Sequence, residues 1–103
     1  MKQVIEGKRY DTSTAREIGA WWNGYPASDF EYCEEKLYLT SKGTFFLAGS
    51  GGAKSHYAQS HGNATGGGEA ITPLSWEEAF QWAQEHLEPE DYSEFFEDLI
   101  EDA

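Results

Sequence analysis

Apolar side chains recur at helical spacing through the last third of the chain and predict two amphipathic helices within residues 75–102. The apolar stripe of the first helix consists of Trp76, Ala79, Phe80, Ala83 and Leu87. The stripe of the second helix consists of Tyr92, Phe95, Phe96, Leu99 and Ile100. Ser75 and Glu78 have the spacing of a capping box at the start of the first helix, and Pro89 suits the first position of the second.

Short aliphatic and aromatic runs between turn residues predict strands. Residues 4–5 and 8–10 flank Glu6-Gly7, where glycine suits the positive φ of a two-residue hairpin turn. Residues 32–39 and 44–48 form the clearest hairpin, and residues 70–74 add one more strand. Residues 49–68 hold seven glycines and almost no apolar side chains, so we expect a long loop there.

A third helix is expected over residues 14–23, since Thr14 and Glu17 have capping-box spacing and Gly24 suits the end of a helix. Its buried face would consist of Ala15, Ile18 and Trp22. The element order implies an α+β fold in one domain, residues 1–103. We expect a small antiparallel sheet of about four to five strands in hairpins, with three helices, two of them C-terminal and acidic.

Charge is distributed unevenly along the chain, whose formal net charge is −12. Residues 1–54 carry all 7 bases and 7 acids, whereas residues 55–103 carry 12 acids and no base. Eleven of these acids fall in the two predicted C-terminal helices: Glu77, Glu78, Glu85, Glu88, Glu90, Asp91, Glu94, Glu97, Asp98, Glu101 and Asp102. This excess disfavours direct binding to nucleic acid or to an anionic membrane and favours a basic protein partner.

Catalytic and metal-binding motifs are weak by comparison. Residues 49–55 resemble a phosphate-binding P-loop, but Ala48 and Ala53 stand where that motif needs glycines. Cys33 is the only cysteine, and the three histidines lack zinc-ligand spacing. We therefore expect no metal and no cofactor. A small hydrolase using His56 or His61 as its base is kept as a less favoured hypothesis.

The acidic helices suggest a mechanism of recognition. Carboxylates three to four residues apart on a helix lie about 5 to 6 Å apart along its axis, comparable to successive phosphates of a nucleic-acid strand. The predicted partner-binding residues are Glu77, Glu78, Glu85, Glu90, Asp91, Glu94, Glu97, Asp98, Glu101, Asp102 and Trp82. Trp82 lies off the apolar stripe and is either an exposed anchor or part of a second packing face.

The alternative to an acidic recognition surface is a protein-interaction module. In that interpretation an aromatic patch around Trp21, Trp22 and Tyr25 would bind a partner, and the acidity would serve only solubility.

Three segments, VIEGKRYDTSTA, CEEKLYLTSKGTFFLAGSGG and GGGEAITPLSWEEAFQWAQEHLEPEDYSEFF, resemble a family of acidic proteins carried by phages and mobile elements of Gram-positive bacteria. Some small proteins of that type are anti-CRISPR inhibitors of Cas9. With this context, the acidic recognition surface predicts a non-enzymatic inhibitor that blocks the basic groove of a host nucleic-acid-binding enzyme, such as a CRISPR-Cas nuclease, as a monomer or weak dimer. The single cysteine and the lack of an apolar leader segment predict a cytoplasmic protein. The resemblance implies a context and assigns no site residues.

Overall fold

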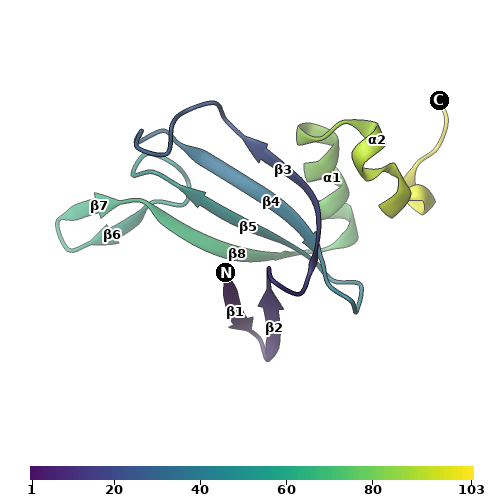
Figure 1. The fold of residues 1–103 in the computed structure, drawn as a ribbon, viewed down its shortest axis with the longest axis horizontal. Coiled ribbons are helices and arrows are strands. Elements are labelled where there is room, and N and C mark those ends of the chain that lie inside the picture. Colours follow the sequence, from purple (N-terminus) through teal and green to yellow (C-terminus); the bar gives the residue numbers. More distant parts are fainter.

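The computed structural model describes the backbone of residues 1–103 and every side chain except that of His61. Its centre is a four-stranded antiparallel sheet in the order β3-β4-β5-β8 (Figure 1). The strands of this sheet are β3 (Arg16–Trp22), β4 (Cys33–Leu39), β5 (Phe45–Gly51) and β8 (Gly68–Leu74). Two separate hairpins accompany it: β1 (Lys2–Ile5) with β2 (Lys8–Asp11), and β6 (Gln59–His61) with β7 (Ala64–Gly66).

Helical structure follows the last strand. The helix α1 (Trp76–His86) packs on one face of the sheet, and α2 (Pro89–Tyr92) is a single turn. Two 3₁₀ turns, η1 (Ser93–Phe95) and η2 (Glu97–Leu99), carry the chain to an extended C-terminal end. The fold is therefore α+β with antiparallel sheets. Within the part of the chain that is described, no helix is long and apolar enough to cross a membrane.

The sheet separates two apolar clusters because successive side chains of a strand point to opposite faces. On the helix side, Leu37 and Phe45 pack with Ala79, Ala83 and Phe96. The other face carries a smaller cluster, covered by the β1–β2 hairpin. In that cluster the Tyr10 ring meets the Phe46 ring edge-on, with centroids 5.4 Å apart. Both faces of β4 and β5 are thus covered over part of their length.

The structure confirms several turns and caps that the sequence predicts. Glu6 and Gly7 have φ of 51° and 79°, as a type I′ hairpin turn requires. The Ser75 side chain accepts a hydrogen bond from the Glu78 amide, and the Glu78 carboxylate accepts one from the Ser75 amide, which completes the capping box. Pro89 lies in the first turn of α2, also as predicted.

The helix predicted over 14–23 is wrong, because Arg16–Trp22 form β3 and the structure has two α-helices in place of three. Ile18, Trp21 and Trp22 are β-branched or aromatic residues that favour a strand, and pairing with β4 outweighs the local capping pattern. A register shift between Glu17 and Gly19 changes the alternation. As a result Ile18 is buried while Trp22 is 55% exposed.

The long loop predicted over 49–68 is also wrong. Gly49 and Gly51 belong to β5, Gly68 begins β8, and β6 and β7 form a hairpin between them. Glycine is needed at position 49 because a Cβ there would collide with the Tyr57 hydroxyl. These glycines allow close approach of neighbouring groups, and their role is not to make the chain flexible.

The acidic helical pair predicted over 75–102 is present only in its first half. The second helix ends after one turn, at Tyr92. Phe96 is fully buried, with its ring centroid 5.1 Å from that of Phe45 and 5.2 Å from that of Phe80. Acids four residues apart, such as Glu97 and Glu101, repel one another and disfavour a continuous helix. Burial of Phe96 and this repulsion together explain the 3₁₀ turns.

Candidate partner-binding surface

All eleven acids of residues 75–102 are exposed. Three lie on α1, Glu88 precedes α2, two lie on α2, and the others follow on η1, η2 and the extended C-terminal end. The ten predicted partner-binding carboxylates are thus accessible and belong to one continuous segment of the chain. We refer to the eleven exposed acids as the acidic surface.

Few bases neutralise the acidic surface. Among the described side chains, one lysine or arginine pairs with it: Arg16 lies 3.5 Å from Glu94, and both side chains are about two-thirds exposed. The Arg16 guanidinium also lies 4.7 Å from the centre of the Phe95 ring, which ties the C-terminal segment to β3. His86 lies 4.0 Å from Glu85 and adds a charge only when protonated. Nearly all of the negative charge therefore faces solvent.

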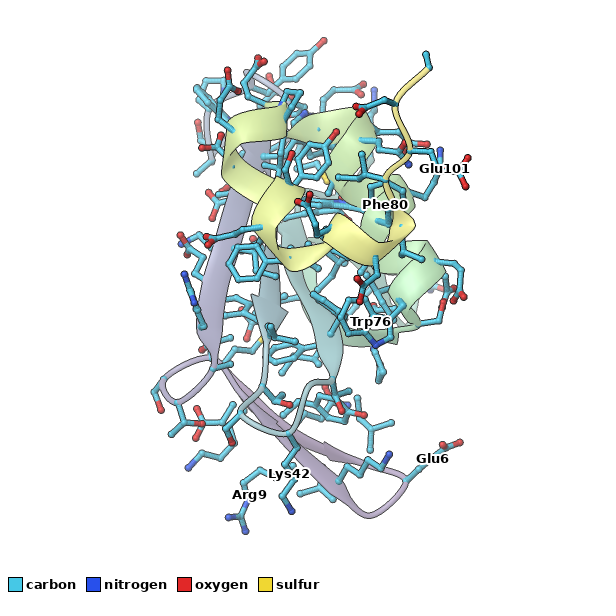
Figure 2. All side chains as sticks on the ribbon, turned by 90° about the vertical axis from the view of Figure 1, so that its right-hand side faces the viewer. Glu6, Arg9, Lys42, Trp76, Phe80 and Glu101 are labelled. Atoms are coloured by element: carbon cyan, nitrogen blue, oxygen red, sulfur yellow. The ribbon has the colours of Figure 1, made fainter. Side chains whose placement is uncertain are left out.

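Arg9 and Lys42 lie at one end of the molecule in one view (Figure 2), together with the acid Glu6, and Glu101 lies away from them. Figure 2 shows Arg9 and Lys42 below the sheet, on the β1–β2 hairpin and the β4–β5 turn, whereas Glu101 lies beside the helices at the other end.

Trp82 does not contribute an exposed anchor. It is 7% exposed, and its indole Nε1 donates a hydrogen bond of 3.0 Å to Oε1 of Glu35. The second packing face is therefore the correct interpretation of this tryptophan. Trp82 supports the acidic surface by fixing α1 to the sheet.

Glu35 is a buried carboxylate that was missed at the sequence level. It is 7% exposed and accepts hydrogen bonds from Trp82 and from the Tyr57 hydroxyl. The Nε2 atom of His56 lies 3.3 Å from Oε2 of Glu35, the oxygen that also accepts from Tyr57. Strand alternation with Cys33 and Leu37, both buried, was the available signal that Glu35 points inward.

The environment of Glu35 explains its ionisation. Burial raises the pKa of this carboxyl, but the hydrogen bonds from Tyr57 and Trp82, with His56 nearby, outweigh burial and hold the pKa below its usual range. Burial, and then the hydrogen bond to Glu35, raise the pKa of the Tyr57 hydroxyl. The pair is therefore a carboxylate and a neutral phenol at neutral pH.

The same cluster bears on the hydrolase hypothesis. A catalytic triad needs a serine hydroxyl hydrogen-bonded to a histidine that also contacts a carboxylate. His56 lies beside Glu35, but the hydroxyl of the neighbouring Ser55 donates to the Gly52 carbonyl at 2.8 Å. No hydrogen bond joins Ser55 to His56 among the described side chains, and the His61 side chain lies outside them. Within that same set, no three histidine, cysteine or acidic side chains lie where they could hold a metal ion.

The predicted aromatic patch is only partly assembled. Trp22 and Tyr25 are 55% and 45% exposed, and the Trp22 indole donates to the Tyr25 carbonyl at 2.6 Å. Trp21 instead turns toward α1, with its ring centroid 4.5 Å from that of His86. Phe30, in the same connection between β3 and β4, is 64% exposed and was not predicted. We call Trp22, Tyr25 and Phe30 the aromatic loop.

Comparison of the chain with protein-family models, with curated proteins and with solved structures gives no match. The function is therefore inferred from the residues of the chain itself.

Proposed function

We propose that this protein is a non-enzymatic inhibitor whose acidic surface mimics a nucleic acid and occupies the basic groove of a nucleic-acid-binding enzyme in a bacterial cell. A CRISPR-Cas nuclease is the partner that the resemblance to small acidic phage proteins favours. The observation that carries the proposal is the exposure of eleven acids in residues 75–102, with a single arginine or lysine paired to them among the described residues.

The stability cost of the acidic surface supports a role in recognition. Like charges three to four residues apart destabilise a helix by about 0.2 to 0.5 kcal/mol per pair. Charge far from zero also opposes the compact state through self-repulsion. Solubility alone needs much less than a net charge of −12 on 103 residues. A basic groove would offset this repulsion on binding.

The arrangement of the acids also suits such a groove. Glu78 is fixed by the capping box, and the Glu85 carboxylate accepts a hydrogen bond of 2.7 Å from Gln81. The surface on α1 is therefore held by a regular helix, and Phe96 anchors the segment that follows it. Pre-positioned charges lose less side-chain entropy on binding than charges on a mobile tail.

Charge reversal tests the proposal. In the triple variant Glu97→Lys, Asp98→Lys, Glu101→Lys, we expect affinity for a guide-loaded Cas9-type nuclease to fall about 100-fold or more, because interfacial charge pairs are each worth a kcal/mol or more. The readout is competition with target DNA for the nuclease.

A matched control separates local recognition from net charge. The variant Glu6→Lys, Glu31→Lys, Glu69→Lys changes net charge by the same amount at exposed acids outside the acidic surface. We expect its affinity to stay within about threefold of the parent chain. If both triple variants lost affinity equally, net charge alone would explain the loss, and the result would contradict a specific binding site.

The exposed aromatic loop favours a second candidate, a protein-interaction module. Aromatic side chains dominate interface hot spots, and Trp22 and Phe30 are each more than half exposed. The variant Trp22→Ala, Phe30→Ala would then abolish capture of the partner while the charge-reversed variant would not. Salt distinguishes the candidates, since the acidic surface predicts steep weakening between low and high ionic strength and the aromatic loop predicts little change.

A further inference from the structure

A cleft of about 540 Å³ lies between the β1–β2 hairpin and the turn that joins β4 to β5. It is lined by Gly7, Lys8, Arg9, Tyr10, Asp11, Thr14, Ala15, Thr40, Ser41, Lys42 and Thr44. Figure 2 shows Arg9 and Lys42 together at this end of the molecule, away from Glu101. We call it the basic cleft.

Unpaired cations are concentrated in the basic cleft. Of the seven bases, Lys2, Arg16 and Lys36 lie within 4.0 Å of an acid. The remaining four, Lys8, Arg9, Lys42 and Lys54, have no acidic partner among the described side chains. Three of those four line the cleft. In a chain with 19 acids, such a group of free cations marks a place where an external anion can supply the missing charge.

The one carboxylate in the lining does not neutralise these cations. Asp11 accepts hydrogen bonds from the Ser13 amide at 2.9 Å and from the Ser13 hydroxyl at 2.7 Å, and Lys2 lies 3.8 Å away. The backbone and side-chain hydrogen bonds from Ser13 lower the pKa of Asp11, so it stays ionised and is satisfied within its own turn. The cations on the two walls therefore keep their charge available.

The walls of the cleft are held in place by the fold. Tyr10 is 5% exposed and anchors β2 on the sheet through Phe46. The N-terminal amine donates to the Thr12 hydroxyl at 2.9 Å, which closes the start of β1 onto the end of β2. On the other wall, the Thr44 amide donates to the Thr40 hydroxyl at 3.1 Å and fixes the turn that carries Lys42.

We propose that the basic cleft binds the phosphate groups of a small polyphosphate-bearing molecule, with Lys8, Arg9 and Lys42 as the cationic contacts. Ser41 and Thr44 add hydroxyl groups to the lining, and guanidinium and ammonium groups are the usual protein donors to phosphate. The volume lies within the range of about 300 to 1,000 Å³ that is typical of small-molecule sites.

The acidic surface does not prevent this binding at physiological salt. Charges farther apart than the Debye length of about 8 Å are largely screened, and none of the eleven acids of the acidic surface lines the cleft. The charged groups that line the cleft are three cations and the Asp11 carboxylate, which pairs with Lys2, so cationic charge prevails there. The inference is independent of the proposed function, because the two surfaces share no residue.

A titration of the full chain with pyrophosphate, followed by backbone amide NMR at about 0.15 M salt, tests the proposal. We expect saturable shifts confined to the amides of Lys8, Arg9, Ser41 and Lys42. The variant Lys8→Gln, Lys42→Gln should weaken binding about tenfold or more, which corresponds to about 1.4 kcal/mol. Both side chains are exposed, and an unchanged amide spectrum elsewhere verifies folding.

The control is Lys54→Gln, which removes the one lysine or arginine outside the cleft that has no acidic partner among the described side chains. It should leave pyrophosphate affinity within about twofold, as expected for a distant independent site. Equal weakening by Lys54→Gln and by the cleft variant, or shifts spread over the whole chain, would overturn the proposal. The charge-reversed variant of Glu97, Asp98 and Glu101 should keep pyrophosphate binding, so failure of the proposed function leaves this test intact.

Two further arms identify the source of the phosphate. Adenosine triphosphate tests a nucleotide, and adenosine alone tests whether the base and sugar are recognised without phosphate. Binding of pyrophosphate or the triphosphate at the cleft supports the proposal. Binding of adenosine with equal affinity would overturn the proposal. So would occupation of the cleft by the acidic segment of a second copy, which would shift the amide signals of the cleft residues when protein concentration alone is raised.

Discussion

Glu35 shows how one buried carboxylate joins three parts of the chain. It lies on β4, and its hydrogen-bond partners come from α1 and from the connection between β5 and β6. Cross-strand pairing places it opposite Gly49, whose missing side chain leaves room for the Tyr57 ring. Sequence spacing alone would not bring these groups together. The carboxylate is satisfied, so its burial stabilises this arrangement and costs little.

Replacing Glu35 tests that role. In Glu35→Gln an NH₂ group replaces one carboxylate oxygen, so a donor would face the donor of Tyr57 or Trp82 in place of an acceptor. We expect the free energy of unfolding to fall by about 2 to 3 kcal/mol. Urea denaturation at pH 7 measures the change. Glu69→Gln, at an exposed carboxylate on β8, is the control and should change stability by less than about 0.5 kcal/mol. Equal effects would contradict a role for the buried cluster.

The pH dependence of stability follows from the depressed pKa of Glu35. A group whose pKa is lower in the folded state stabilises the protein above its unfolded pKa, about 4.3 for glutamate, and that contribution is lost as pH falls through the folded pKa. The stability difference between the parent chain and Glu35→Gln should therefore be constant near neutral pH and shrink below about pH 4 to 5. A difference that grows on acidification would show that the carboxyl is protonated in the folded protein.

At the scale of elements, the segment after α1 is shaped by the burial of aromatic rings more than by helix propensity. Phe80 of α1 meets both Tyr92 and Phe96, with ring centroids 6.2 and 5.2 Å apart. Figure 2 shows Phe80 and Trp76 on the side of α1 where this segment lies. A straight second helix is replaced by short turns that keep Phe96 in the core and leave the acids in solvent.

Truncating Phe96 should release the segment. Phe96→Ala removes a fully buried ring, so we expect a loss of about 3 to 5 kcal/mol in the free energy of unfolding. Hydrogen exchange should also lose protection across η1 and η2. The comparison variant is Leu99→Ala at a residue 40% exposed, with an expected loss below about 1 kcal/mol. Retained protection in Phe96→Ala would mean that other contacts hold this segment.

At the scale of the whole molecule, an excess of acids on the C-terminal segment is separate from a group of three unpaired bases in the cleft. The acidic surface lies on the helices and the C-terminal end, and Figure 1 shows the β1–β2 hairpin, which carries part of the cleft lining, below the sheet. Among the described side chains no lysine or arginine of the cleft pairs with the acidic surface, which pairs instead with Arg16 on β3 through Glu94. The two proposals therefore concern different residues of one fold.

Salt should stabilise this protein. Raising ionic strength from about 0.02 M to 0.5 M screens the repulsion within the acidic surface, so we expect the thermal midpoint to rise by several degrees. The triple variant of Glu97, Asp98 and Glu101 to lysine halves the net charge of −12 and should respond less. A midpoint that falls with salt would mean that ion pairs such as Arg16 with Glu94 outweigh the repulsion.

Sequence patterns within a few residues predicted the turns, the helix start and the strands that depend on neighbouring residues. Glycine at a two-residue turn, serine and glutamate at a helix start, and alternating apolar runs predicted the β1–β2 hairpin, the beginning of α1 and strands β4, β5 and β8. They failed where a segment is stabilised by distant residues. The β3 segment carries a helix-start pattern, yet pairing with β4 makes it a strand, because ladder hydrogen bonds and packing outweigh one local cap.

The sequence by itself determined that negative charge accumulates after residue 54, because charge depends on residue type alone. Only the tertiary structure decided that Trp82 is buried against Glu35 and that Lys8, Arg9 and Lys42 meet in one cleft. These groupings depend on strand register and on which face of the sheet each side chain occupies. Both are set by contacts between residues far apart in the chain, which local patterns do not contain.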